Sequence, residues 1–316
     1  MRSSVAAEKG REVLFMKKKL KQNTARYGNT KIGYAFMMPF LLFFFTFTLL
    51  PVAISFFMSL TDYNLMEAPS FVGLSNYKSL ILDDDEFIIS LKNTFIFAGI
   101  SGPFSFFASF VLAWIISRLN KLRNFFALAL YVPSLTSGIA LSSVWLYFFS
   151  NDSYGLINNL LYQLGFITEP IKWTLDPKYI LGVVIFISVW MGMGNGFLSF
   201  IAGMQNLSPE LSEAGMVDGI DNSFQELIYI ILPQLKPQLL FGAVNSIVSA
   251  FAVFDIATAV AGMPSPNYAA HTIVAHLYDY AFIRFEMGYA SAVAVTLFVI
   301  TFILNRIVMK IFASKD

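Results

Sequence analysis

Six long apolar segments limit what this chain can fold into. They lie at about 32–60, 91–117, 125–149, 179–204, 237–261 and 287–309, and each has the roughly 20 residues that a helix needs to cross a bilayer. The fourth segment contains no charged residue, and the fifth contains only Asp255. Charged residues make up 13% of the 316 residues, against about 25% in an ordinary soluble chain. The sequence therefore predicts an all-α integral membrane protein with six transmembrane helices.

Two of these segments carry residues that disturb a straight helix. The first contains Pro39 and Pro51, so we expect it to be kinked. The fourth contains Gly192, Gly194 and Gly196, which permit either a close approach of another helix or a local break.

Basic residues indicate which loops lie inside the cell. Residues 1–31 carry nine of the 21 Lys and Arg, and no apolar stretch there is long enough for a signal peptide. Placing both termini and the loops 118–124 and 205–236 in the cytoplasm puts sixteen of the 21 on that side, and the acidic run at 83–86 outside. The sequence predicts a cytoplasmic tail at 1–31, either solvated or lying on the membrane surface, and a transmembrane domain at 32–316 in the cell (plasma or inner) membrane.

The sequence has no pattern typical of a metal site. It contains no Cys, so it has neither disulfides nor thiolate ligands. Its two histidines, His271 and His276, are five residues apart, which is a poor spacing for shared ligation on a helix, and they lack companion ligands. We therefore expect no metal in this chain.

The loop at 205–236 has the signals of a short helix of its own. Ser208 can cap a helix that has Pro209 at its first position, and Gly219 is a natural left-handed stop. The predicted helix covers about 209–218. Ala214 and Gly215 are expected to stand together on one side, where a partner can approach the backbone, with the carboxylate of Glu213 beside them.

This loop resembles a known motif. Glu213-Ala214-Gly215, then Gly219, then Leu232-Pro233 is similar to the EAA loop of the membrane subunits of ATP-binding-cassette (ABC) importers. Gly215 replaces the family's second Ala, and the gap before Leu232-Pro233 is one residue longer. The resemblance implies a type I ABC importer permease fold with a cytoplasmic coupling helix. The residues it assigns to ATPase coupling are Glu213, Ala214, Gly215, Asp218 and Gly219. The alternative is an ordinary capped loop that matches by chance.

Three further stretches resemble the carbohydrate-uptake branch of that family, in particular its maltose and glycerol-phosphate first permeases. They are SLTDYN at 59–64, FVGLSNYKSL at 71–80 and LKNTFIF at 91–97. The alternative, an aromatic-rich interfacial loop, explains the Tyr and Phe content but not its order.

The resemblance implies a transport subunit rather than an enzyme. Its partners would be a second homologous permease, two cytoplasmic ATPase subunits, an extracellular solute-binding protein, a carbohydrate and the lipid bilayer, with no nucleic acid. ATP and Mg²⁺ would bind the ATPase subunits and this chain would need no cofactor; the sequence has no GxxxxGK[ST] phosphate loop. The alternative is a self-sufficient ion-coupled secondary transporter, which usually needs several buried carboxylates and an inverted repeat.

Polar residues inside the spans suggest a substrate pathway. In the fifth segment, Asn245, Ser249, Ala252 and Ile256 are expected to share one helical face. Resemblance to the maltose-type subunit assigns substrate contact to these positions: Ser188, Met191, Gly192, Asn245, Val248, Ser249 and Ala252. The alternative is that such residues only hold helices together.

Asp255 is the only ionisable group well inside a span, and a carboxylate there is costly. We expect it to act as a gate or to hold a turn rather than to relay protons.

Overall fold

The computed structural model describes residues 30–119 and 121–312, and its two compact units, 1–55 and 56–316, are considered separately. The first unit contributes helix α2 (Thr30–Phe44), the π turn η1 (Phe45–Leu49) and the start of α3 (Leu50–Met58). Pro51 follows this π turn. A proline lacks an N–H and its ring crowds the preceding turn, and the wider π turn gives it room. The predicted tail at 1–31 lies outside the described residues, apart from its last two.

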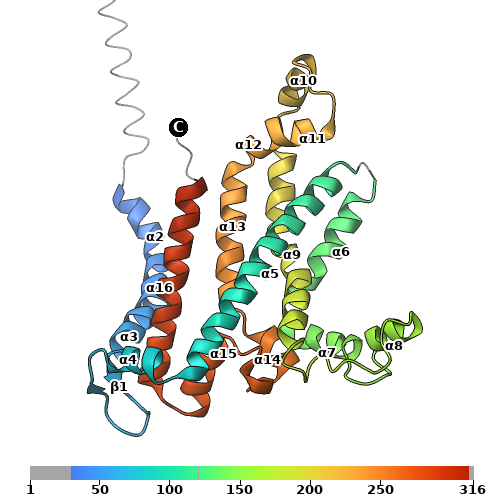
Figure 1. The fold of residues 1–316 in the computed structure, drawn as a ribbon. Coiled ribbons are helices and arrows are strands. Elements are labelled where there is room, and N and C mark those ends of the chain that lie inside the picture. The colour runs from blue at the N-terminus through green and yellow to red at the C-terminus, as the bar shows by residue number, and fades with distance from the viewer. Residues whose placement is uncertain (1–29, 120, 313–316) are drawn as a thin grey trace, which may run out of the picture. The chain divides into compact units, whose positions relative to one another are not determined.

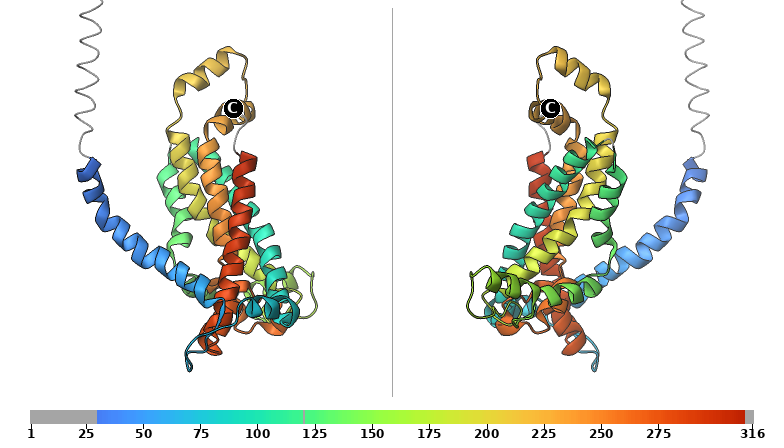
Figure 2. Two further views of the ribbon diagram at one scale, coloured as in Figure 1. Left: turned by 90° about the vertical axis from the view of Figure 1, so that its left-hand side faces the viewer. Right: turned by 90° about the vertical axis from the view of Figure 1, so that its right-hand side faces the viewer.

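Four long helices run side by side in the second unit (Figures 1 and 2). They are α5 (Asp85–Ser117), α9 (Ile180–Gln205), α13 (Lys236–Phe251) and α16 (Met287–Phe312). α5 packs extensively against α9 and next against α13. The contact between α5 and α9 buries Phe110, Phe197 and Phe200. The predicted spans 91–117, 179–204 and 287–309 are confirmed as helices.

Glycines of α9 allow close approach, and the helix is unbroken. A Cβ atom on Gly192 would lie 2.9 Å from Oγ of Ser105, which belongs to α5. A Cβ atom on Gly194 would lie 2.5 Å from Oγ of Ser134, on the neighbouring helix α6 (Arg123–Leu135). Of the two expectations for these glycines, close helix packing is confirmed and a local break is wrong.

The prediction of one continuous helix at 125–149 is wrong. The segment forms α6 (Arg123–Leu135) and α7 (Gly138–Phe148), which meet at an angle of 100°. Thr136 and Ser137 have ψ angles of 140° and 132°, which are extended rather than helical values. Pro133 in the last turn of α6 cannot donate to the carbonyl oxygen of Ala129, which weakens this end of the helix. Within the described residues, five helices are long and apolar enough to cross a membrane, or six if this bent pair counts as one span.

The fifth predicted span, 237–261, is also interrupted. α13 ends at Phe251, and the short helix α14 (Asp255–Ala261) begins after Phe254, whose φ and ψ are −139° and −65°. Ala252 closes the last turn of α13, where its N–H donates to the carbonyl oxygen of Val248, so the predicted face of Asn245 and Ser249 reaches Ala252. The prediction that Ile256 continues this face is wrong. The break turns Ile256 into a buried core position of α14.

Short elements close the two ends of the bundle (Figure 1). One end carries α10 (Pro209–Val217), α11 (Ser223–Glu226), the π turn η2 (Leu227–Ile231) and α12 (Leu232–Gln234). The other end and its loops carry β1 (Thr61–Asp62), β2 (Ser70–Phe71), α4 (Ser75–Leu82), α8 (Leu156–Gln163), η3 (Pro266–Tyr268), α15 (Ile273–Tyr278) and η4 (Asp279–Ile283). β1 and β2 pair antiparallel, with Thr61 opposite Phe71.

The acidic run at 83–86 is part of a helix start rather than a free loop. The carboxylate of Asp84 accepts a hydrogen bond from the backbone N–H of Phe87 at 2.7 Å, and Asp85 and Glu86 lie in the first turn of α5. Carboxylates are favoured at a helix N-terminus, because the helix dipole presents positive charge there. α5 therefore starts six residues before the predicted span.

Candidate functional site

Two adjoining cavities lie between α5, α9 and α13 and beside the breaks in the two interrupted spans. The first has a volume of about 110 Å³ and lies between the three long helices. The second, of about 430 Å³, lies where the break between α6 and α7 faces the break between α13 and α14. Both cavities are lined by Ser188, Gly192, Ser249 and Val253, so they form one continuous lining.

Most of the residues predicted for the substrate pathway line these cavities. Asn245 lines the first cavity, and Met191 and Ala252 line the second, together with the shared residues. Val248 lines neither of the two and is 46% exposed. The structure thus brings together six of the seven predicted positions from two helices, and their role in transport stays a prediction.

Two hydroxyls in the lining have no hydrogen-bond partner within the part of the chain that the structure describes. They are the buried Oγ atoms of Ser101 and Ser188, and both residues line the first cavity. Leaving a buried hydroxyl unpaired costs roughly 1–3 kcal/mol, so a ligand hydroxyl that bonds to it would recover that energy. By contrast, Ser109 donates to the carbonyl oxygen of Met193 at 2.7 Å and holds α5 against α9. The unpaired hydroxyls are the groups best suited to a hydroxylated ligand.

The contribution of α5 was not predicted from the sequence. Ser101 and Ser105 line the first cavity from this helix. With Ser109 they repeat at every fourth residue, which places all three on one helical face. That spacing is the signal that would have identified them.

Asp255 lies in the first turn of α14 and is exposed to the second cavity. Its Cβ atom is 3.3 Å from the position that a Cβ on Gly138 would take, so it lies directly against the start of α7. A carboxylate at this helix start is favoured by the backbone N–H groups. Asp255 therefore stands between the two interrupted spans; whether it acts as a gate stays a prediction.

The predicted helix in the 205–236 loop is present as α10. It ends at Val217, and Gly219 follows with φ +94°, a left-handed conformation that suits glycine. Pro209 occupies the first turn as expected, although the side chain of Ser208 makes no capping hydrogen bond.

The orientation of α10 differs from the prediction. Glu213 and Ala214 are exposed, as are Val217 and Asp218, whereas Gly215 is buried. A Cβ on Gly215 would lie 2.5 Å from Cδ1 of Ile230, so this glycine faces its own chain rather than an approaching partner. The prediction that Ala214 and Gly215 form one outward surface is wrong, because neighbouring helical residues point about 100° apart.

The extra residue between Gly219 and Leu232-Pro233 coincides with the π turn η2. A π turn closes each hydrogen bond over five residues instead of four, so it takes up one residue within an otherwise helical segment. The longer spacing is thereby absorbed before Pro233.

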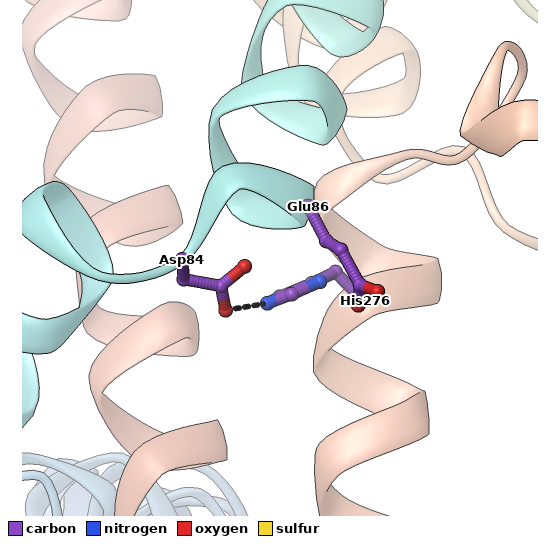
Figure 3. Close-up of side chains that lie close together, drawn as sticks. All are labelled: Asp84, Glu86 and His276. Atoms are coloured by element: carbon purple, nitrogen blue, oxygen red, sulfur yellow. Dashed lines mark ion pairs between the residues drawn. The ribbon is translucent and has the colours of Figure 1, made fainter.

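Asp84, Glu86 and His276 lie close together in a separate cluster (Figure 3). It lies at the end of the bundle where α5 begins, away from α10 (Figure 1). Nε2 of the fully buried His276 lies 3.1 Å from Oδ2 of Asp84. The same oxygen accepts hydrogen bonds from the hydroxyls of Tyr280 and Tyr289. Burial opposes the ionised form of Asp84, but these donors and the N–H of Phe87 outweigh it and lower the pKa of Asp84.

The companions of His276 were not predicted, because Asp84 and Glu86 lie far from it in the sequence. One ligand atom from each of Asp84, Glu86 and His276 lies within 4.8 Å of the others, a spacing that a metal ion could use. However, Asp84 already accepts three hydrogen bonds, and Arg284 holds Glu86 at 3.0 Å and Asp279 at 2.7 Å. The cluster therefore works as a connection between α5, α15 and α16.

Comparisons with known proteins agree with this architecture. The family described as "Binding-protein-dependent transport system inner membrane component" matches residues 105–314. The chain is 35% identical to the probable ABC transporter permease protein YesP of Bacillus subtilis, over 88% of this chain and 89% of that protein. It is 31% identical to the arabinooligosaccharides transport system permease protein AraP of the same organism, over 91% and 90% of the two chains.

A solved structure has the same fold. A chain from the crystal structure of a bacterial ABC transporter that imports the acidic polysaccharide alginate superposes with a TM-score of 0.76 at 21% identity, covering 93% of this chain and 98% of that one. Together with the membrane-length helices and the loop helix α10, these matches identify the chain as a member of the binding-protein-dependent transport system inner membrane component family, a multi-pass ABC importer permease subunit and not an enzyme.

Proposed function

We propose that this permease forms half of the pathway by which a sugar or oligosaccharide crosses the cell membrane. A second homologous permease supplies the other half. Two cytoplasmic ATPase subunits, which bind ATP and Mg²⁺, drive the cycle, and an extracellular solute-binding protein delivers the substrate. Both termini and α10 face the cytoplasm, and the end of the bundle that contains Asp84 faces the outside of the cell.

The observation that carries the sugar assignment is the cavity lining. Asn245, Ser249 and the hydroxyls of Ser101 and Ser188 offer hydrogen bonds in a lining that also contains Ser105 and Ser246. Such a lining suits a neutral, hydroxyl-rich ligand. The relative that shares 31% of its sequence is an arabinooligosaccharide permease by name, which supports the same substrate class.

The exposed side of α10 supports contact with an ATPase subunit. The exposed side consists of Glu213, Ala214 and Val217, and Val217 is 87% exposed. Gly215 lies on the buried side against Ile230, and Gly219 follows the end of the helix. Asp218, at the end of the helix, extends the same exposed surface. The exposed apolar surface is larger than one side chain, since the adjacent Met216 is 62% exposed, and such a patch is suited to burial against a partner.

The decisive experiment compares the assembled complex with the isolated chain. In proteoliposomes, the complex with its ATPase and binding protein should take up sugar when ATP is supplied. The permease alone should move no sugar under an H⁺ or Na⁺ gradient. Uptake by the isolated chain would instead identify a secondary transporter.

A matched pair of variants tests the α10 surface. Val217→Asp places a charge in the proposed contact and should prevent co-purification of the ATPase, and Glu213→Ala should weaken it. Asp221→Ala changes an exposed carboxylate of the same loop outside α10 and should retain the ATPase. Normal ATPase recovery with Val217→Asp would exclude this surface.

A further inference from the structure

A chain of polar contacts connects α10 to the end of α5. Oγ of Ser212, on α10, donates to Oε1 of Glu226 at 2.9 Å. The second carboxylate oxygen of Glu226 accepts from Nη2 of Arg118 at 2.7 Å. Arg118 directly follows α5. One carboxylate on α11 therefore holds the loop helix with one oxygen and the long helix with the other.

The Arg118 guanidinium is fixed by more than this ion pair. Its Nη1 donates to Oγ of Ser223 at 2.6 Å, so both of its terminal nitrogens are bonded to α11. The guanidinium also lies over the ring of Trp114, with 5.1 Å between Cζ and the ring centroid. Because guanidinium is planar and donates in fixed directions, these contacts set the position of α11 relative to the end of α5.

α5 continues from this point into the substrate cavity. Ser101 and Ser105 of the same helix line that cavity, and Ser109 binds the backbone of α9. A displacement of α10 can therefore reach the cavity wall through the hydrogen bonds of Ser212, Glu226 and Arg118 and then through the backbone of α5.

We propose that Arg118 and Glu226 are positioning residues that transmit movement of α10 to α5 and thereby link ATP hydrolysis to the state of the substrate cavity. The inference rests on the proposed function of α10. Side-chain exposures of 37% for Arg118 and 27% for Glu226 leave the pair able to re-form as the loop moves. A partly exposed pair contributes little to stability, so its loss should change coupling and leave the fold intact.

The experiment measures the ratio of sugar-stimulated to basal ATP hydrolysis by the purified complex in proteoliposomes. Arg118→Gln and Glu226→Gln should each lower this ratio by up to about fivefold, the factor that corresponds to ~1 kcal/mol for a partly exposed pair. The double variant should lose no more than either single variant. The charge-exchanged pair Arg118→Glu with Glu226→Arg should recover part of the ratio, which a simple loss of folding would not allow.

Lys121→Gln is the control, since it removes a positive charge from the same loop without touching Glu226 and should leave the ratio unchanged. An equal loss in that variant, additive losses in the double variant, or unchanged ratios in both single variants would each overturn the proposal. These outcomes presuppose that the wild-type complex retains its ATPase and its stimulated hydrolysis; without these, it is the proposed function that fails.

Discussion

Gly194 of α9 gives a sharp test of how tightly the spans are packed. In Gly194→Ala the new Cβ would lie 2.5 Å from Oγ and 2.7 Å from Cβ of Ser134, and 3.0 Å from the carbonyl oxygen of Leu130. The first two atoms belong to a short side chain and the third to the backbone of α6, so no flexible chain end can move aside. Overpacking of this kind typically destabilises by about 1–3 kcal/mol.

Gly182 is the matched control on the same helix. A Cβ there has no neighbour within 4 Å, so Gly182→Ala adds a methyl group into open space. Both substitutions gain the same helix propensity, up to about 1 kcal/mol. The difference between the two variants therefore isolates the packing term.

The assay is the apparent melting temperature of the purified protein in detergent. Gly194→Ala should melt below Gly182→Ala by about 1–2 °C for each kcal/mol of packing loss, since the chain has 316 residues. In the Ser134→Gly background, Gly194→Ala should lower the melting temperature less than it does in the wild type, because the clash with the Ser134 side chain is gone. Some loss should remain, because the clash with the carbonyl oxygen of Leu130 remains. Equal melting temperatures for the two alanine variants would refute the close packing of α9 against α6.

The remaining predictions concern the cavity and the cluster at the other end of the bundle. Asn245→Leu should reduce sugar uptake while assembly survives, since an unpaired substrate hydroxyl costs on the order of 1–3 kcal/mol; unchanged uptake kinetics would assign Asn245 to helix packing. Asp84→Asn should lower the melting temperature, because three donors lose their charged acceptor, whereas Asp85→Asn at the exposed neighbouring position should not. Burial lowers the pKa of His271 from 6.5 to about 4. As the pH drops, the His271 side chain is therefore protonated in the unfolded chain before it is protonated in the folded chain. The free energy of unfolding should fall by up to about 3 kcal/mol as the pH drops from 6.5 toward 4. His271→Gln should show a smaller loss of melting temperature over that range; an identical pH profile would contradict the assignment.

Features that depend on local sequence were predictable, and features that depend on tertiary packing were not. The length of an apolar run indicates that a segment can cross a bilayer, and Pro209 and Gly219 mark both ends of α10. An apolar run does not indicate where a helix breaks, so the interruptions near Ser137 and Phe254 were missed. The same is true of residues that the fold brings together from distant positions.

The candidate site divides in the same way. The i, i+4 rule correctly grouped Asn245 with Ser249 but failed beyond the end of α13, where the backbone leaves the helical region. The predicted orientation of Gly215 was wrong, because its contact with Ile230 arises only when the loop folds back on itself. Likewise, Asp84 and His276 meet only because α5 and α15 are neighbours.

The sharp bend after α6 has a consequence for the lifetime of this subunit in the cell. Thirteen residues of helix rise about 20 Å, which is short of the roughly 30 Å of a bilayer's hydrocarbon layer. The non-helical backbone after Leu135 therefore lies where lipid offers it no hydrogen bonds, unless protein or a water-filled cavity covers it. We expect the chain to be short-lived when it is synthesised without the second permease that we propose as its partner. Its abundance would then be set by the supply of that partner.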